Sequence, residues 1–172
     1  HYPLRRQRQM CIRDRLGALL LYAGWPSSPL FPLLFVGMSC FLLSAKQMID
    51  NEAKAGKYFL VLFLGLLTWN ILTTWWIYHA TLGGMIMAVI GNSLLMYLPF
   101  MLYRLAHKVN VQKITLLVFI TAWLGYEYLH HNWSLTWPWI TLGNGLAKFP
   151  SIIQWYEYTG TAGGSLWILM IN

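Results

Sequence analysis

One carboxylate stands inside an apolar stretch of this chain, in the segment WLGYEYLHH at residues 123–131. Glu127 lies near the end of that stretch. A carboxylate within hydrocarbon is costly, so such a residue usually faces the interior of a helix bundle and is a functional candidate. The alternative is that Glu127 lies at interfacial depth, where water hydrates it. The sequence leaves both interpretations open.

Two histidines and two cysteines are the other residues whose types could do chemistry. His130 and His131 could bind a metal, but neighbouring helical side chains point about 100° apart and no third ligand is obvious. We therefore expect both histidines to be solvated at an interface, and we expect neither a metal nor a cofactor. Cys40 lies in an apolar run, where a free thiol behaves as a small hydrophobe, and Cys11 lies close to the N-terminus.

An aromatic passage, HNWSLTWPWITLGN, follows at residues 131–144. An indole ring has an apolar body and one N–H, so it favours the boundary between bilayer and water. Pro138 fixes a bend between two tryptophans and removes a backbone donor. An ordinary aromatic belt is one interpretation, and a bent, partly immersed loop that admits a lipid sideways is the other. On the second interpretation, the lipid-access side is lined by Glu127, Trp137, Trp139 and Asn144.

The elements that must position these residues are apolar and long. The 172 residues are 58% hydrophobic and only 10% charged, whereas a soluble domain is about a quarter charged. About 20 apolar residues cross a bilayer as a helix. The sequence therefore predicts an all-α, polytopic transmembrane helix bundle with five spans and the start of a sixth. Its apolar segments are residues 16–25, 30–45, 58–78, 85–103, 114–129 and 162–172.

Basic residues predict how the bundle is oriented. Two connections, residues 46–57 and 104–113, carry three lysines or arginines each, whereas the connections at 26–29, 79–84 and 130–161 hold only Lys148. Because short cytoplasmic loops are enriched in lysine and arginine, the basic loops should face the cytoplasm and the aromatic passage should face outward. Asn70 and Asn92 lie within spans and should hydrogen-bond between helices.

The first fifteen residues, HYPLRRQRQMCIRDR, differ from the rest of the chain. The piece MCIRDR resembles the translation of a transposon end used in sequencing libraries, so we expect residues 1–15 to be a non-native leader. A genuine basic tail and the start of a signal peptide are the alternatives. Without the leader's five arginines and one aspartate, the net charge falls from +7 to +3. We therefore expect no nucleic-acid partner.

Several stretches together resemble a known family. Trp123, Glu127 and His130 precede WPW at residues 137–139 and LGN at residues 142–144, and QWYEYTGTAGGSLWILMIN follows. Earlier, AGWPSSPLFPLLFVGM and TWWIYHATLGGM occur in the matching order. From residue 16 to its end the chain is similar to bacterial apolipoprotein N-acyltransferases. It departs from the family at His130, where many relatives carry arginine.

The resemblance implies a two-step acyl transfer. The family moves an acyl chain from a phospholipid to a cysteine thioester, and then to the amine of the lipidated N-terminal cysteine of an apolipoprotein. A Glu/Lys/Cys triad in a nitrilase-like domain does this chemistry, and residues 1–172 hold no such triad. The resemblance thus implies that residues 16–172 are a truncated N-terminal transmembrane domain of a bacterial inner-membrane enzyme. We expect this domain to be inactive alone, with no catalytic residue and its aromatic loop in the periplasm.

Two other functions remain open from the sequence. A small membrane transporter is one, although intramembrane charge is scarce and no inverted repeat is visible. A non-enzymatic membrane scaffold is the other. The coding sequence that follows Asn172 would separate the scaffold from the acyltransferase.

Overall fold

The computed structural model describes residues 2–25, 29–108, 112–134 and 136–172, and in them it is helical, with no strand. It contains six α-helices and three short 3-10 helices, η1 to η3, in the described residues. The helices are α1 (Tyr2–Gly24), α2 (Leu33–Asp50), α3 (Ala55–Thr74), η1 (Trp75–His79), α4 (Leu82–His107), α5 (Gln112–Asn132), η2 (Pro138–Ile140), η3 (Leu142–Leu146) and α6 (Tyr156–Met170).

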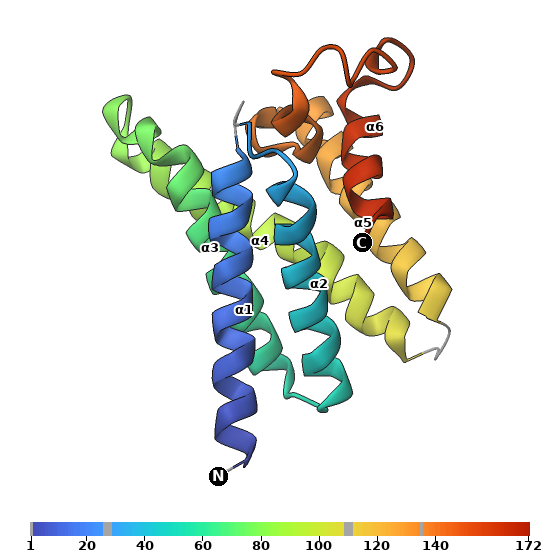
Figure 1. Cartoon of the computed structure of the whole chain (residues 1–172). Helices are drawn as coiled ribbons and strands as arrows, with labels where there is room; N and C mark the ends of the chain where they lie inside the picture. Colours follow the sequence, from blue (N-terminus) through green and yellow to red (C-terminus); the bar gives the residue numbers. More distant parts are fainter. Residues whose placement is uncertain (1, 26–28, 109–111, 135) are drawn as a thin grey trace.

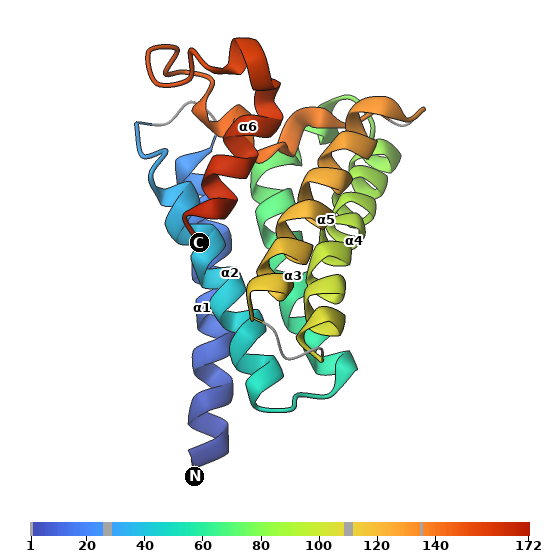
Figure 2. The same ribbon diagram turned by 90° about the vertical axis from the view of Figure 1, so that its right-hand side faces the viewer.

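The helices run up and down between two ends of the molecule (Figures 1 and 2). At one end lie the N-terminus, the connection from α2 to α3, and the facing ends of α4 and α5; we call this the basic end. At the other lie the turn from α3 to α4 and the segment from α5 to α6; we call this the aromatic end. In the described residues, the connection between α2 and α3 and the segment between α5 and α6 thus lie at opposite ends. Which end faces the cytoplasm stays a prediction.

Three helical stretches are long and apolar enough to cross a membrane, among the residues described: Leu33–Asp50, Ala55–His79 and Leu82–His107. The helices extend beyond the apolar segments that the sequence marks. The α2 helix continues through Lys46 and Gln47, because lysine, glutamine and methionine are good helix formers. As a result, only residues 51–54 connect α2 to α3.

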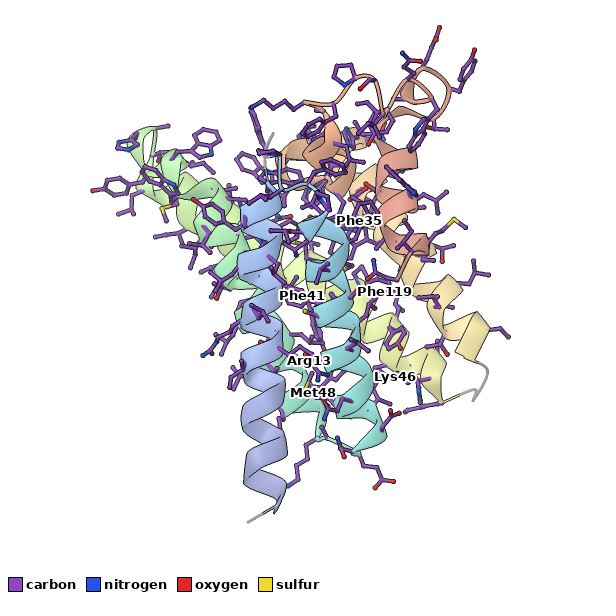
Figure 3. The ribbon with its side chains drawn as sticks, viewed as in Figure 1. Arg13, Phe35, Phe41, Lys46, Met48 and Phe119 are labelled. Carbon is purple, nitrogen blue, oxygen red and sulfur yellow. The ribbon has the colours of Figure 1, made fainter. Side chains whose placement is uncertain are left out.

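A cluster of aromatic rings fills the centre of the bundle. Phe100 lies 4.9 Å from Phe119 and 6.1 Å from both Phe41 and Trp123, measured between ring centroids. All four side chains are fully buried, and Figure 3 shows Phe41 midway along α2. Many large apolar side chains instead face outward from the helices, as expected for surfaces in contact with hydrocarbon. Examples are Leu60, Met87, Leu98 and Leu117.

The α1 and α2 helices touch backbone to backbone. A Cβ atom on Gly17 would lie 2.9 Å from the carbonyl oxygen of Gly37, and one on Gly37 would lie 3.0 Å from that of Gly17. Small residues at a helix crossing allow this approach, which increases the packing contacts between helices in a membrane.

Polar side chains join α3, α4 and α5 at the bundle interior. Tyr126 donates to Asn92 Oδ1 at 2.5 Å, Asn92 Nδ2 donates to Asn70 Oδ1 at 2.7 Å, and Asn70 Nδ2 donates to the Leu66 carbonyl at 2.9 Å. Each of the three side chains is buried. We call these residues the polar seam. The prediction that both asparagines hydrogen-bond between helices is confirmed.

At the basic end, cationic side chains tie helix ends together. Arg104 on α4 donates to the Ala53 carbonyl at 2.6 Å and lies over the Tyr58 ring, 4.8 Å from its centroid. Arg13 on α1 donates to Gln47 Oε1 on α2 at 3.1 Å, and Figure 3 shows Arg13 toward this end of the molecule. Arg104 and Arg13 therefore hold neighbouring segments together at this end.

Candidate functional site

The segment between α5 and α6 folds back over the end of α5. It turns because Pro138 stands at the first position of η2, where its missing N–H is tolerated. The Trp137 N–H donates to the His130 carbonyl at 3.2 Å. Asn144 Nδ2 donates to the Pro138 carbonyl at 2.9 Å. This segment therefore forms a cover whose shape depends on Pro138 and Asn144.

Glu127 lies beneath this cover and is only 3% exposed. Its Oε1 atom accepts two hydrogen bonds of 2.9 Å each, from Trp123 Nε1 one turn earlier on α5 and from the Leu142 N–H in the cover. Of the two interpretations open from the sequence, the structure therefore has the buried one. The carboxylate joins α5 to the cover.

The Ser165 hydroxyl on α6 also contacts the Glu127 carboxylate. It accepts the Gly143 N–H at 2.9 Å and can donate its own proton to Glu127. Glu127 Oε2 has no closer hydrogen-bond partner among the described residues. The carboxylate therefore links α5, the cover and α6.

The first turn of α6 packs against the cover. The Tyr156 hydroxyl donates to the Gly143 carbonyl at 2.9 Å. Burial, and secondarily the charge on Glu127, raises the pKa of Tyr156 to about 12. The phenol therefore remains a hydrogen-bond donor at any physiological pH. Beyond it, α6 is kinked at Gly160, whose φ is 61°.

The two tryptophans expected at the lipid-access side lie differently. Trp139 is 57% exposed and meets Trp76 of η1 edge to face, with 5.6 Å between centroids. Trp137 is half-buried, lies 6.4 Å from Trp139, and its Nε1 has no partner among the described residues. The structure thus places Glu127, Trp137, Trp139 and Asn144 at one end of the molecule, the carboxylate below and Trp139 outermost.

His130 differs from the expectation of a solvated side chain. It is 4% exposed, packed between Tyr126 and Trp133 with ring centroids 4.7 Å and 5.2 Å away. Its position four residues after Tyr126 puts both side chains on the same face of α5. Neither ring nitrogen has a partner among the described residues. The expectation is met only by His131, which is exposed and has Nε2 3.3 Å from the Thr141 hydroxyl.

Two hollows flank the end of α5. The smaller, about 180 Å³, lies between α5 and α6 and is lined by Glu127 and His131, by three threonines, and by Ala162 near the kink. The larger, about 430 Å³, is an apolar groove between α4 and α5, with His130 among its lining residues. Tyr128 lines both hollows. The aromatic end thus offers two hollows side by side, and only the smaller one has a carboxylate and threonines in its lining.

Sequence reasoning missed the backbone partners of the site. The N–H groups of Leu142 and Gly143, and the hydroxyls of Tyr156 and Ser165, connect the cover to α5 and α6. No residue type marks a backbone donor. The pattern GNG at residues 143–145 was a signal of close backbone approach, since glycines allow it.

A helical bundle with several apolar helices and a buried carboxylate under an aromatic cover defines a polytopic membrane protein. Comparison with known families identifies which kind. Residues 17–172 match the apolipoprotein N-acyltransferase N-terminal domain, and the chain belongs to that family.

One curated relative illustrates how much of such a protein the chain represents. The apolipoprotein N-acyltransferase of Chlorobaculum tepidum is 28% identical over 160 residues, which cover 91% of this chain but 29% of the relative. The chain therefore spans less than a third of that relative's length. No solved structure matches the chain.

Proposed function

We propose that this chain is the membrane-embedded N-terminal part of an enzyme that transfers an acyl chain from a phospholipid to the lipidated N-terminal cysteine of an apolipoprotein. Its aromatic end receives the phospholipid. The observation that carries the proposal is Glu127, buried beneath an aromatic cover in a chain of this family. Trp137, Trp139 and Asn144 shape the cover on the lipid-access side.

In this proposal five helices cross the bacterial inner membrane and α6 begins a sixth crossing. The α5 helix has 21 residues, and at 1.5 Å per residue it is about 30 Å long. The basic end faces the cytoplasm, as the lysines and arginines favour. The aromatic end lies at the periplasmic surface.

Residues 1–15 are proposed to be foreign to this domain. The family match begins at Gly17. The genomic sequence at this locus tests the proposal directly, and encoded residues identical to 1–15 would contradict it.

The catalytic groups of the proposed enzyme lie outside this chain. Purified chain in detergent, supplied with phospholipid and a diacylated lipopeptide, is expected to form no N-acylated product. Mass spectrometry of the lipopeptide reports the result. Product formed by the chain without a partner would contradict this part of the proposal.

A chimera tests the function itself. Residues 17–172 would replace the matching part of the Chlorobaculum tepidum relative, and the purified chimera would be given phospholipid. We expect acyl transfer at a reduced but measurable rate. A chimera that folds, judged by gel filtration, but transfers no acyl chain would contradict the proposal and favour a scaffold that only anchors its partner.

Orientation is tested by labelling single cysteines in a chain whose Cys11 and Cys40 are replaced by alanine. Lys148→Cys at the aromatic end should react with a membrane-impermeant maleimide from the periplasmic side. Glu52→Cys at the basic end should react only after the membrane is opened. The reverse pattern would invert the topology and remove the outer-leaflet role.

A further inference from the structure

We propose that α4 is a gate: its first half, residues 82–95, pivots at Pro99 away from α5, and the hydrogen bond from Tyr126 to Asn92 is the latch that holds it closed. The inference goes beyond the proposed function and does not depend on it. It starts from a proline inside α4 that lines the apolar groove between α4 and α5. Opening of the gate widens this groove toward the surrounding bilayer.

Pro99 removes one hydrogen bond from the middle of α4. Its nitrogen carries no hydrogen, so it cannot donate to the Leu95 carbonyl four residues earlier, and its ring crowds that carbonyl. Kinks in long helices occur at such positions. Leu95 and Pro99 both line the groove of about 430 Å³, and the small residues Ala122 and Gly125 line its α5 side. The helix is therefore weakest where a gap separates it from α5.

The two halves of α4 are held differently. In the described stretch of residues 82–91, Val89 is the one buried residue, and Figure 1 shows the turn that precedes this stretch leaning outward past α1. Beyond the proline, Phe100 is fully buried against Phe119, with 4.9 Å between centroids, and its carbonyl accepts the Tyr58 hydroxyl at 2.9 Å. Because packing contacts hold helices together in a membrane, the second half is fixed and the first half can move.

One side-chain hydrogen bond joins the first half of α4 to α5 among the described residues. The Tyr126 hydroxyl donates to Asn92 Oδ1 at 2.5 Å, and both side chains are buried. The other bond of Asn92, to Asn70, stays within the hairpin of α3 and α4 and does not reach α5. An edge-to-face contact between two exposed rings, Trp76 and Trp139, adds to it at the aromatic end. Loss of the Tyr126 bond therefore releases the gate.

Pulsed electron paramagnetic resonance measures the gate in the complete 172-residue chain in nanodiscs. Cys11 and Cys40 are replaced by alanine. One spin label is placed at exposed Leu43 of α2, the helix whose backbone contacts α1. The second is placed on α4, at exposed Met87 before the hinge or at exposed Leu105 beyond it. We expect a closed and a smaller open distance population for Met87, and a single population for Leu105.

Two kinds of variant should shift the populations in opposite directions. Tyr126→Phe removes the latch and keeps the ring, so the ratio of open to closed for Met87 should rise about fivefold, the effect of losing one hydrogen bond of ordinary strength. Asn92→Leu is a second latch variant and should act in the same direction. Pro99→Ala supplies the missing N–H donor, so the ratio should fall about fivefold or more. Leu94→Ala, at an exposed site of α4, is the control and should leave the ratio unchanged.

Three outcomes overturn the proposal. A single population at Met87 that persists in both latch variants would mean that α4 is rigid. Two populations that do not respond to Pro99→Ala would be fraying of a helix end. An equal shift at Leu105 would mean that the whole helix moves and that Pro99 is no hinge. Gel filtration checks that each labelled variant is folded. None of these results bears on acyl transfer by the chimera, so failure of this inference is separable from failure of the proposed function.

Discussion

The polar seam and the site under the aromatic cover are both buried polar clusters, but only the first is complete. In the seam, Tyr126, Asn92 and Asn70 pass hydrogen bonds from α5 to α4 to α3 and end on a backbone carbonyl. Of the eight buried side-chain atoms without a partner in the described residues, four belong to Glu127, His130 and Trp137. Half of these atoms therefore lie at the aromatic end, in three different surroundings, whereas the seam is a structural link between helices.

The largest expected effect comes from a substitution that disrupts the cover but changes no side chain of either polar cluster. A Cβ on Gly143 would overlap the backbone carbonyl of Thr161. We expect Gly143→Ala to lower the free energy of unfolding by about 3 kcal/mol or more, since backbone cannot move aside as a side chain can. Thermal unfolding in detergent measures it. Gly56→Ala, where nothing lies within 4 Å, is the control and should not destabilise.

Breaking the polar seam should have the next largest effect. Asn92→Leu leaves the Tyr126 hydroxyl and Asn70 Oδ1 without partners, so we expect a loss of about 1–2 kcal/mol in unfolding free energy. Asn132→Ala, at an exposed asparagine on the same helix bundle, should change stability by less than about 0.5 kcal/mol. Equal stability of the two variants would mean that the seam is not a structural link.

Asp14 sharpens the comparison, because it is a buried carboxylate in the segment proposed to be foreign, and one of its two oxygens has no partner in the described residues. Asp14→Ala should raise the free energy of unfolding by about 1 kcal/mol, as it removes a buried polar group without a hydrogen bond to its Oδ1. Chemical unfolding of the variant beside exposed Arg15→Ala measures the gain. Destabilisation by Asp14→Ala would show that this carboxylate has a partner or a role.

The contact between the cover and α6 should weaken at high pH. The neutral Tyr156 phenol is favoured in the fold, because its pKa is about 12 there against 10 in the unfolded chain. Its stabilisation is therefore complete below pH 10 and is lost as the pH rises toward 12. The difference in melting temperature between the unaltered chain and Tyr156→Phe should shrink across that window. A constant difference from pH 9 to 12 would contradict this account.

The smallest effect on stability is expected from Trp139→Ala, below about 0.5 kcal/mol, because that side chain is largely exposed. Buried Trp25→Ala should instead lose about 3 kcal/mol or more. In the acyltransferase chimera, only Trp139→Ala should slow thioester formation from phospholipid at unchanged expression. Thioester formation at the unaltered rate would count against Trp139 on the lipid-access side.

The alternation of helices and the interhelical asparagines could be predicted because they follow from composition. A long apolar run favours a membrane-spanning helix, and an amide within a span favours a hydrogen bond to another helix. Lysine and arginine in a loop favour the cytoplasmic side. The positions of single aromatic residues could not be predicted as well. Trp25 is 8% exposed and packs on Trp69 inside the bundle, whereas Trp139 is largely exposed, since an indole suits either place.

The sequence predicted which residues of the candidate site lie near one another, but it did not predict their burial or their hydrogen bonds. Glu127, Trp137, Trp139 and Asn144 do lie at one end, and their roles there stay predictions. Burial of Glu127 was undecided because it depends on the Leu142 N–H, fifteen residues away. His130 was placed wrongly because its burial depends on Trp133 and on the groove beside α4, which no local pattern reveals.

The direct contact between Gly17 and Gly37 limits how this domain can deform. Two helices whose main chains touch have no intervening side chains that can rotate to let them slide or part. The α4 and α5 helices instead meet through side chains, among them the Tyr126 phenol and the Asn92 amide, and side chains can change rotamer. A lipid that enters the bundle from the bilayer would therefore pass more easily between α4 and α5 than between α1 and α2.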